Sequence, residues 1–202
     1  MTAERPGNDR RCSARTGAVE ALLIGAVGVG AVSASLVAAP GWSGAGGGAL
    51  AGLMAAIAIV DRRRLVIPDE LNGAAFIAGL AAAGLWSGAA REEAIFDSLL
   101  RASLMFGLFF AFRTAYRRTR GVEGMGLGDV KLAAVAGAWL NWAWLPVAVD
   151  MAALSALAVT LVRRLRGLGF DPKARLPFGA YFAPAIWICW LLAAMRGDWA
   201  LN

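Results

Sequence analysis

The sequence contains no histidine, and its two cysteines, Cys12 and Cys189, lie near opposite ends of the 202 residues. The lack of histidine excludes Ser-His and Cys-His catalytic pairs and an HExxH zinc site. The cysteines form no CxxC pair, which excludes zinc modules and thioredoxin-like redox motifs. We therefore expect no metal and no cofactor. Any chemistry must come from carboxylates, lysines, hydroxyls or the backbone.

Charged residues are also scarce. They make up 17% of the chain, whereas hydrophobic residues make up 59%. A soluble domain is nearer to about one quarter charged, so this composition indicates an integral membrane protein surrounded by lipid. The net charge of +6 would suggest nucleic-acid binding in a soluble protein. Here the basic residues lie between apolar segments, which indicates cytoplasmic loops and no nucleic-acid partner.

Seven apolar segments predict an all-α fold, a polytopic bundle of membrane helices. Their ranges are roughly 18–39, 46–60, 71–86, 94–115, 130–144, 147–162 and 178–195. Several are shorter than the roughly 20 residues that a span needs, so protein rather than lipid could surround their ends. Only Leu145 and Pro146 separate the fifth segment from the sixth. A single kinked helix, and six spans instead of seven, is therefore the alternative.

The basic clusters favour seven spans with the amino terminus inside the cell. In that topology every cluster faces the cytoplasm, and the outer loops hold one arginine, Arg91. Residues 1–16 predict a basic cytoplasmic tail, and residues 17–197 a membrane-embedded domain. The glycine-rich run at residues 44–48 predicts a flexible outer turn, since it lacks the lysine of a phosphate loop. The clusters fall at residues 5–15, 62–64, 117–120, 163–166 and 173–175.

Two aspartates stand at the predicted cytoplasmic ends of spans. Asp61 ends the second segment, and Asp129 opens the fifth after a run of glycines. If their carboxylates face each other, both cannot stay ionised, and the pair holds one proton. One member can then activate a water while the other polarises a peptide carbonyl. Taken singly, Asp129 is equally well explained as a helix N-cap, and Asp61 as an acid neutralised by the following arginines.

The remaining acids have simpler explanations. Asp69 follows Pro68, a pattern typical of helix initiation, so a structural or substrate-orienting role is favoured over catalysis. Asp97 and Arg101 are four residues apart and are predicted to form an ion pair, which Asp150 could join. Small residues at intervals of four in the first two segments predict close helix packing.

Three motifs resemble those of the type IV prepilin peptidases, which are membrane-embedded aspartyl proteases. "GMGLGDVKL" at 124–132 resembles the family's GxGD signature, and "DRRRLVIPDELN" at 61–72 is similar to its first aspartate motif. "RLPFGAYFAP" at 175–184 resembles its Pro-Phe-Gly-Pro element, with Ala180 in place of the last proline. The motifs occur in the family's order with apolar segments between them.

This resemblance implies that Asp61 and Asp129 form the catalytic pair. It implies that prepilin-like precursors are the substrates, cut behind a short basic leader at the cytoplasmic face of the inner membrane. The cysteine-bearing amino-terminal domain of bifunctional members is not recognisable in this sequence, so a peptidase-only short form is expected. The residues expected to shape or close the site are Gly126, Gly128, Lys131, Asp69, Pro177, Phe178 and Gly179.

Two other functions remain open at this point. A transporter or channel subunit could use Asp61 and Asp129 as ion or proton sites. Such proteins often contain internal repeats with paired interrupted segments, and the sequence shows none. A catalytically silent scaffold of a secretion machine is the third possibility.

Overall fold

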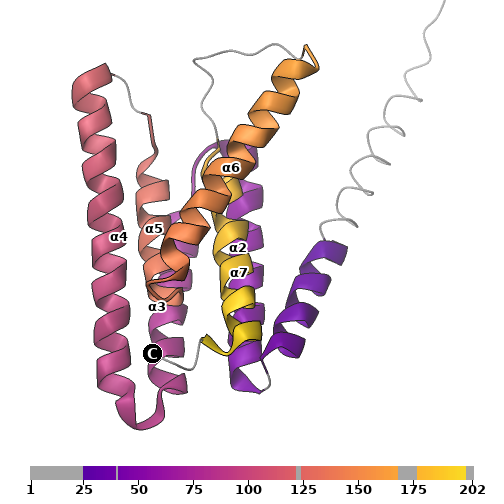
Figure 1. Ribbon diagram of the computed structural model, residues 1–202, viewed down its shortest axis with the longest axis vertical. Coiled ribbons are helices and arrows are strands. Elements are labelled where there is room, and N and C mark those ends of the chain that lie inside the picture. The colour runs from indigo at the N-terminus through magenta and orange to yellow at the C-terminus, as the bar shows by residue number, and fades with distance from the viewer. Residues whose placement is uncertain (1–24, 40, 122–123, 168–176, 199–202) are drawn as a thin grey trace, which may run out of the picture.

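Consecutive helices run in alternating directions along the long axis of the molecule (Figure 1). The structure, a computed structural model, describes residues 25–39, 41–121, 124–167 and 177–198. This part of the chain contains no strand, which confirms the all-α prediction. Its helices are Gly25–Ala38, α2 (Trp42–Arg64), α3 (Asp69–Trp86), α4 (Arg91–Arg120), α5 (Leu127–Trp139), α6 (Trp144–Leu165) and α7 (Gly179–Arg196), with a 3-10 turn η1 (Gly88–Ala90) before α4.

Four segments are long and apolar enough to cross a bilayer: Trp42–Arg64, Gly88–Arg120, Trp144–Leu165 and Gly179–Arg196. Large apolar side chains remain exposed on their outer faces, such as Leu154 and Leu157 on α6. In a bilayer these faces meet lipid rather than water, so the fold is that of a membrane helix bundle. The predicted count of seven spans stays a prediction, because some of the remaining helices are shorter than a span requires.

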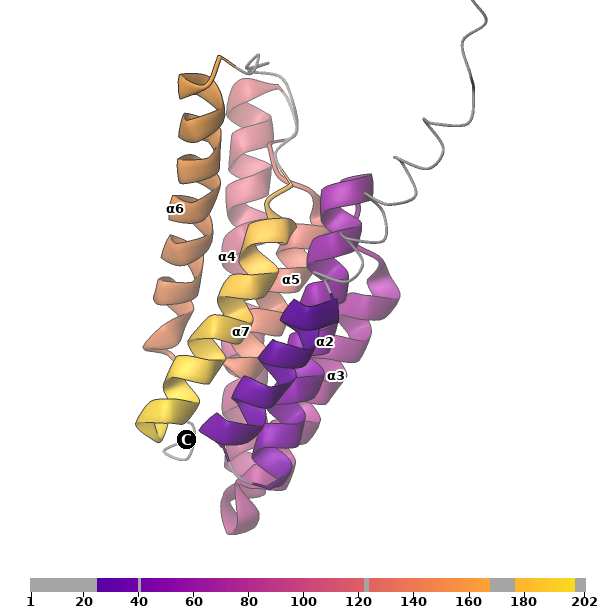
Figure 2. The same cartoon turned by 90° about the vertical axis from the view of Figure 1, so that its right-hand side faces the viewer.

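The shortest of the numbered α-helices, α5, lies in the middle of the bundle. It packs against α3, α4 and α7, and Figure 2 shows it between α4 and α7. Eight of its 13 residues are buried, including Val130, Leu132 and Val135. Because protein surrounds α5, its short length does not expose backbone polar groups to lipid.

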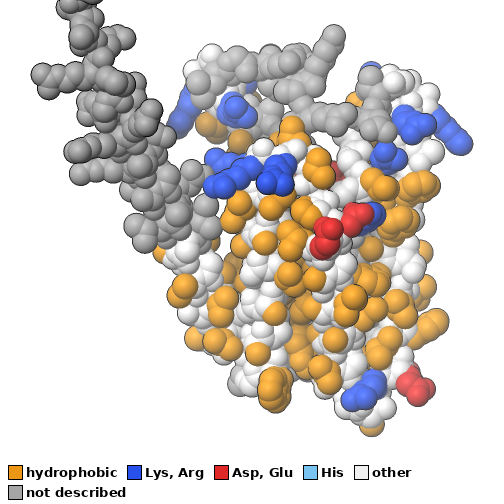
Figure 3. Space-filling view, turned by 180° about the vertical axis from the view of Figure 1, so that it is seen from behind, with side chains coloured by type: hydrophobic (Ala, Val, Ile, Leu, Met, Phe, Trp, Pro, Cys, Tyr) orange, Lys and Arg blue, Asp and Glu red, His pale blue; other side chains and the backbone are white. Residues whose placement is uncertain are grey.

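Arginines gather at one end of the bundle, which we call the basic end. Helices α2, α4 and α6 all finish there, with Arg62–Arg64, Arg117–Arg120 and Arg163–Arg164 in their last turns (Figure 1). Figure 3 shows Lys and Arg side chains concentrated at this end. The predicted tail and the basic clusters at 5–15 and 173–175 lie outside the described residues.

The outer turn predicted at residues 44–48 is wrong, because these residues belong to α2. A Cβ added to Gly47 would stand 1.8 Å from the ring of Trp190, and one added to Gly46 would stand 2.4 Å from the ring of Trp86. Glycine therefore allows two tryptophans to pack directly on the α2 backbone. The run is a helix-packing surface of the kind that membrane helices use for close approach.

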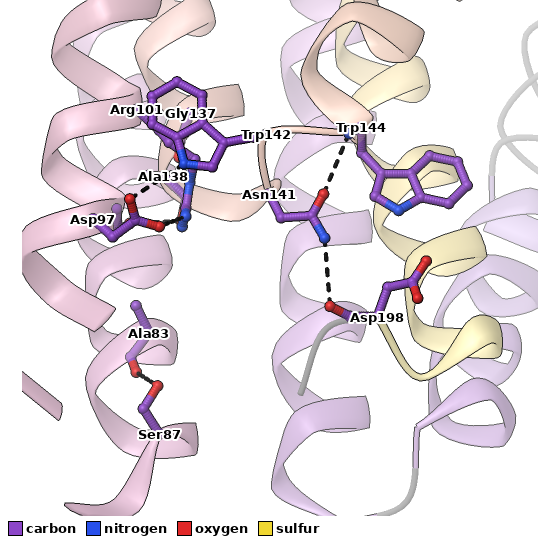
Figure 4. Close-up of polar contacts among 11 residues, drawn as sticks. Ala83, Ser87, Asp97, Arg101, Gly137, Ala138, Asn141, Trp142, Trp144 and Asp198 are labelled. Atoms are coloured by element: carbon purple, nitrogen blue, oxygen red, sulfur yellow. Dashed lines mark hydrogen bonds and ion pairs between the residues drawn. The ribbon is translucent and has the colours of Figure 1, made fainter. Parts of the chain in front are cut away.

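The predicted break between the fifth and sixth segments is also misplaced. The chain leaves helix at Leu140–Ala143, and Pro146 lies in the first turn of α6, where its missing N–H breaks no helical hydrogen bond. The Asn141 side chain accepts from the N–H of Trp144 (3.3 Å) and donates to the carbonyl of Asp198 (3.4 Å), as Figure 4 shows. The structure therefore has two separate helices here, α5 and α6, and not one kinked helix.

The ion pair predicted from spacing, Asp97 with Arg101, is confirmed (Figure 4). Arg101 is only 4% exposed and also donates from Nε to the carbonyl of Gly137 on α5 (3.2 Å). The indole N–H of Trp142 donates to the other oxygen of Asp97 (3.3 Å). Asp150 is exposed on α6 and takes no part in the pair. The buried Arg101 thus joins α4 to α5 in the half of the bundle away from the basic end.

The α4–α5 contact predicts a steric limit at Gly137. A Cβ on Gly137 would lie 2.6 Å from backbone atoms of Ala102, which cannot move without separating the helices. We expect Gly137→Ala to lower the free energy of unfolding by about 1–3 kcal/mol, measured by thermal unfolding in detergent. The control is Gly107→Ala on α4, where a Cβ has nothing within 4 Å. Equal unfolding midpoints for the two variants would contradict this packing.

Candidate active site

Asp61 and Asp129 lie next to each other at the basic end, where α2, α5 and α7 meet. Both side chains are buried, with 5% and 9% exposure. A Cβ built on Gly179 would stand 3.0 Å from Asp61 Oδ2 and 3.2 Å from Asp129 Oδ1. The two oxygens therefore border one point, and their separation cannot exceed the sum of these distances. The juxtaposition that the sequence allowed is present in the structure.

Asp61 is positioned by the way α2 ends. The carbonyl of Asp61 accepts from the N–H of Leu65 (2.8 Å), and Leu65 adopts the left-handed conformation that ends the helix (φ 54°). The chain then turns sharply into α3, which begins at Asp69 after Pro68, as predicted. This turn inserts the buried side chain of Ile67 beside the carboxylates, 2.6 Å from the Cβ position of Gly179.

Asp129 is positioned by the start of α5. It is the third residue of the helix, not its N-cap, and its Oδ2 accepts from the N–H of the N-cap residue Gly126 (3.3 Å). This is one of the two hydrogen bonds of a capping box, since glycine has no side chain to supply the other. Its Oδ1 is buried and has no hydrogen-bond partner among the described residues. Gly126 has an ordinary backbone conformation (φ −70°), so its N–H matters here more than its flexibility. Gly128 allows close approach, since its Cβ position lies 3.0 Å from Ile67.

Two contacts tie the start of α3 to the start of α5. Asn72, which the sequence reasoning missed, is 3% exposed and donates from Nδ2 to the carbonyl of Gly128 (3.2 Å). An amide placed one turn into an otherwise apolar helix was the available signal. Lys131 pairs with Asp69 (2.6 Å), so its charge balances Asp69 rather than the buried pair. Both partners of that ion pair are substantially exposed, and such pairs stabilise little.

The start of α7 closes the site. The N–H of Ala180 donates to Asp61 Oδ2 (2.8 Å), and the N–H of Gly179 interacts with both carboxylates. Of the predicted neighbours, Gly179 thus meets the pair directly. Phe178 packs against Phe182 (ring centroids 5.4 Å apart) and Phe109 (6.5 Å) on the side of α4. Pro177 is half-buried immediately before this turn.

The arrangement is suited to acid–base chemistry. Two buried carboxylates that border one point disfavour double ionisation, because each would face a like charge in a medium of low polarity. Backbone N–H groups supply hydrogen bonds that stabilise a single negative charge. The pair can therefore hold one proton and exchange it with a bound group.

Comparison with known proteins agrees with the motifs. Residues 48–161 match the type IV leader peptidase family, a range that includes both aspartates and ends before Gly179. A prepilin leader peptidase/N-methyltransferase of Burkholderia pseudomallei is 34% identical over 181 residues, covering 88% of this chain and 56% of that protein. The corresponding protein of Aeromonas hydrophila is 29% identical over 177 residues, covering 85% and 57%.

A shorter relative matches over more of its own length. The leader peptidase HopD of Escherichia coli is 34% identical over 125 residues, covering 62% of this chain and 78% of that protein. The chain thus spans a little over half the length of the bifunctional relatives above. No solved structure matches the chain.

The contact between Asn72 and Gly128 gives a prediction for stability. Asn72→Ala removes the donor and leaves the Gly128 carbonyl unpaired, so we expect the free energy of unfolding to fall by about 1–3 kcal/mol. The measurement is thermal unfolding in detergent. Glu70→Ala changes an exposed residue of the same helix and serves as the control. If the two variants unfold together, Asn72 does not hold the start of α5.

Proposed function

The chain belongs to the type IV leader peptidase family, and we propose that it is an aspartyl endopeptidase that removes the leader of prepilin-like precursors. The observation that supports this most directly is the pair of buried carboxylates, Asp61 and Asp129, bordering one point at the basic end. A hydrolytic site of this kind needs a base that activates water and an acid that protonates the peptide carbonyl. Two aspartates that share a proton meet this need without any further catalytic group.

In the proposed reaction a water molecule lies between the carboxylates and the scissile peptide. The ionised carboxylate takes a proton from the water, which attacks the carbonyl carbon. The protonated carboxylate gives its proton to the carbonyl oxygen, so that no charged oxyanion has to persist. Water is the nucleophile, and no covalent intermediate with the enzyme forms.

We propose that the basic end faces the cytoplasm. Arginine-rich loops are retained on that side of the membrane, and they attract the anionic lipid surface. The substrate's hydrophobic helix would enter beside the bundle from the lipid, and its basic leader would extend into the cytoplasm. The peptide at the cleavage point must be unwound, because a backbone amide locked in a helix cannot be attacked by water.

The catalytic assignment predicts the effect of single amide substitutions. Asp61→Asn and Asp129→Asn should each lower the rate of leader cleavage by about 100- to 10,000-fold, since each removes half of the acid–base pair. The assay uses purified protein in detergent with a prepilin-like precursor, and the products are measured by mass spectrometry. Asp150→Asn, on the exposed face of α6, is the matched control and should cleave normally.

Cleavage that survives both substitutions would reject the assignment. No cleavage by the wild-type protein, together with proton flux through reconstituted vesicles that depends on Asp61 and Asp129, would favour the transporter alternative.

The close approach of Gly179 to the two carboxylates and to Ile67 predicts that cleavage activity and thermal stability can be changed independently. Gly179→Ala should abolish cleavage, because the new methyl group would stand 3.0 Å and 3.2 Å from the two carboxylates and would force them apart. It should also lower stability, because Ile67 Cδ1 would be 2.6 Å away. Adding Ile67→Val removes that atom, so the double variant should regain thermal stability without regaining cleavage. Recovery of both properties would show that the close approach of Gly179 to the carboxylates is not needed for cleavage.

A further inference from the structure

We propose that Asp61 is the ionised member of the pair and acts as the base, that Asp129 carries the proton, and that the backbone N–H of Ala180 enforces this division. The inference rests on the proposed function and goes beyond it, because neither the family nor the juxtaposition of the carboxylates distinguishes the two roles. Ala180 thereby becomes a positioning residue that acts through its backbone and not through its side chain.

The first observation is the hydrogen bond from Ala180 to Asp61 Oδ2. At 2.8 Å it is shorter than the 3.3 Å hydrogen bond that Asp129 accepts from Gly126. The donor belongs to the first turn of α7, an 18-residue helix whose amino-terminal N–H groups carry partial positive charge. Hydrogen bonds of this kind favour the charged form of the acceptor.

The second observation is the state of Asp129. Asp129 accepts from the Gly126 N–H at Oδ2 over a longer distance, 3.3 Å. The Gly179 N–H interacts with both acids and so does not distinguish them. Its Oδ1 is buried without a partner among the described residues. A buried, ionised oxygen without a donor is unfavourable, whereas a protonated Oδ1 becomes a donor itself. This oxygen borders the same point as Asp61 Oδ2, so a proton on it lies on the side of Asp129 that is shared with Asp61.

The charged and titratable neighbours are paired, hydrogen-bonded or exposed. On α4, Arg113 donates from Nε to the carbonyl of Met125 (3.1 Å). On α3, the carboxylate of Asp69 is paired with Lys131 of α5, and Glu70 is exposed. On α2, the residues after Asp61 are Arg62–Arg64, all exposed, and on α7 the nearest titratable residue in sequence is Tyr181.

The roles then fix the path of each proton. Asp61 takes a proton from water as the oxygen bonds to the peptide carbon, and Asp129 gives its proton to the carbonyl oxygen. The neutral tetrahedral intermediate breaks its C–N bond as Asp61 passes its proton to the leaving nitrogen. A hydroxyl proton of the intermediate returns to Asp129. The products are a carboxylic acid and an amine, and both aspartates recover their starting states.

The first test removes the donor and keeps the rest of the site. Ala180→Pro deletes the N–H at a position in the first helical turn, where proline is tolerated. Without this donor Asp61 ionises less readily, so the acid limb of the pH–rate profile for leader cleavage should move up by about one pH unit. Ala180→Val adds similar bulk but keeps the N–H, and its acid limb should coincide with that of the wild type. An unmoved or lowered limb in Ala180→Pro overturns the proposal.

A second test requires neither cleavage of a substrate nor the Ala180→Pro substitution. The carboxylates are labelled with ¹³C-aspartate, and the pH-dependent infrared signal of each single Asp→Asn variant is compared with that of the double variant. The difference isolates Asp61 in the Asp129→Asn protein and Asp129 in the Asp61→Asn protein. Asp61 should ionise at the lower pH, and the reverse order overturns the inference. Failure of the wild-type protein to cleave any precursor would instead count against the proposed function, which this measurement does not require.

Discussion

The structure depends on bringing two acidic side chains together in a buried place. Carboxylates avoid both burial and each other, so the surrounding residues must make their meeting tolerable. Two features make this possible. Glycines beside the carboxylates leave space for them, and backbone N–H groups donate hydrogen bonds to them. Gly128 and Gly179 leave room for Ile67 and for the carboxylates, while the starts of α5 and α7 direct N–H groups at the two acids.

The rest of the bundle holds these helix ends in register. Helix α5, which presents Asp129, is enclosed by protein and fixed at both ends: Asn72 holds the Gly128 carbonyl at one end, and Arg101 holds the Gly137 carbonyl at the other. Helix α7, which presents Gly179 and Ala180, is anchored by aromatic packing between Phe182 and Phe109 (5.8 Å). A shift along either helix axis would move an acid or a donor away from the common point. Precise contacts far from the site therefore contribute to its geometry.

Much of this organisation could be predicted from the sequence where the signal is carried by residue type and spacing. Composition indicated a helical membrane bundle, the four-residue interval paired Asp97 with Arg101, and Pro68 marked the start of α3. Predictions failed where tertiary packing decided the outcome. The glycines at 44–48 suggested a turn because no local pattern reveals that two tryptophans from other helices pack on them. Pro146 suggested a break because a local pattern does not distinguish the first turn of a helix from the end of the preceding one.

The donor at Ala180 could not be predicted in this way, because every residue except proline has a backbone N–H and the sequence does not mark which of them binds a carboxylate. Its only trace in the sequence is that alanine stands where the element it resembles has proline. Proline at this position would have no N–H, and Asp61 would keep only the interaction with Gly179 from this helix. The alanine therefore adds a hydrogen bond to one acid of the pair while leaving the glycine that separates them unchanged. In the proposed division of roles, replacing proline by alanine therefore makes the two aspartates chemically less alike, because only Asp61 gains the added donor.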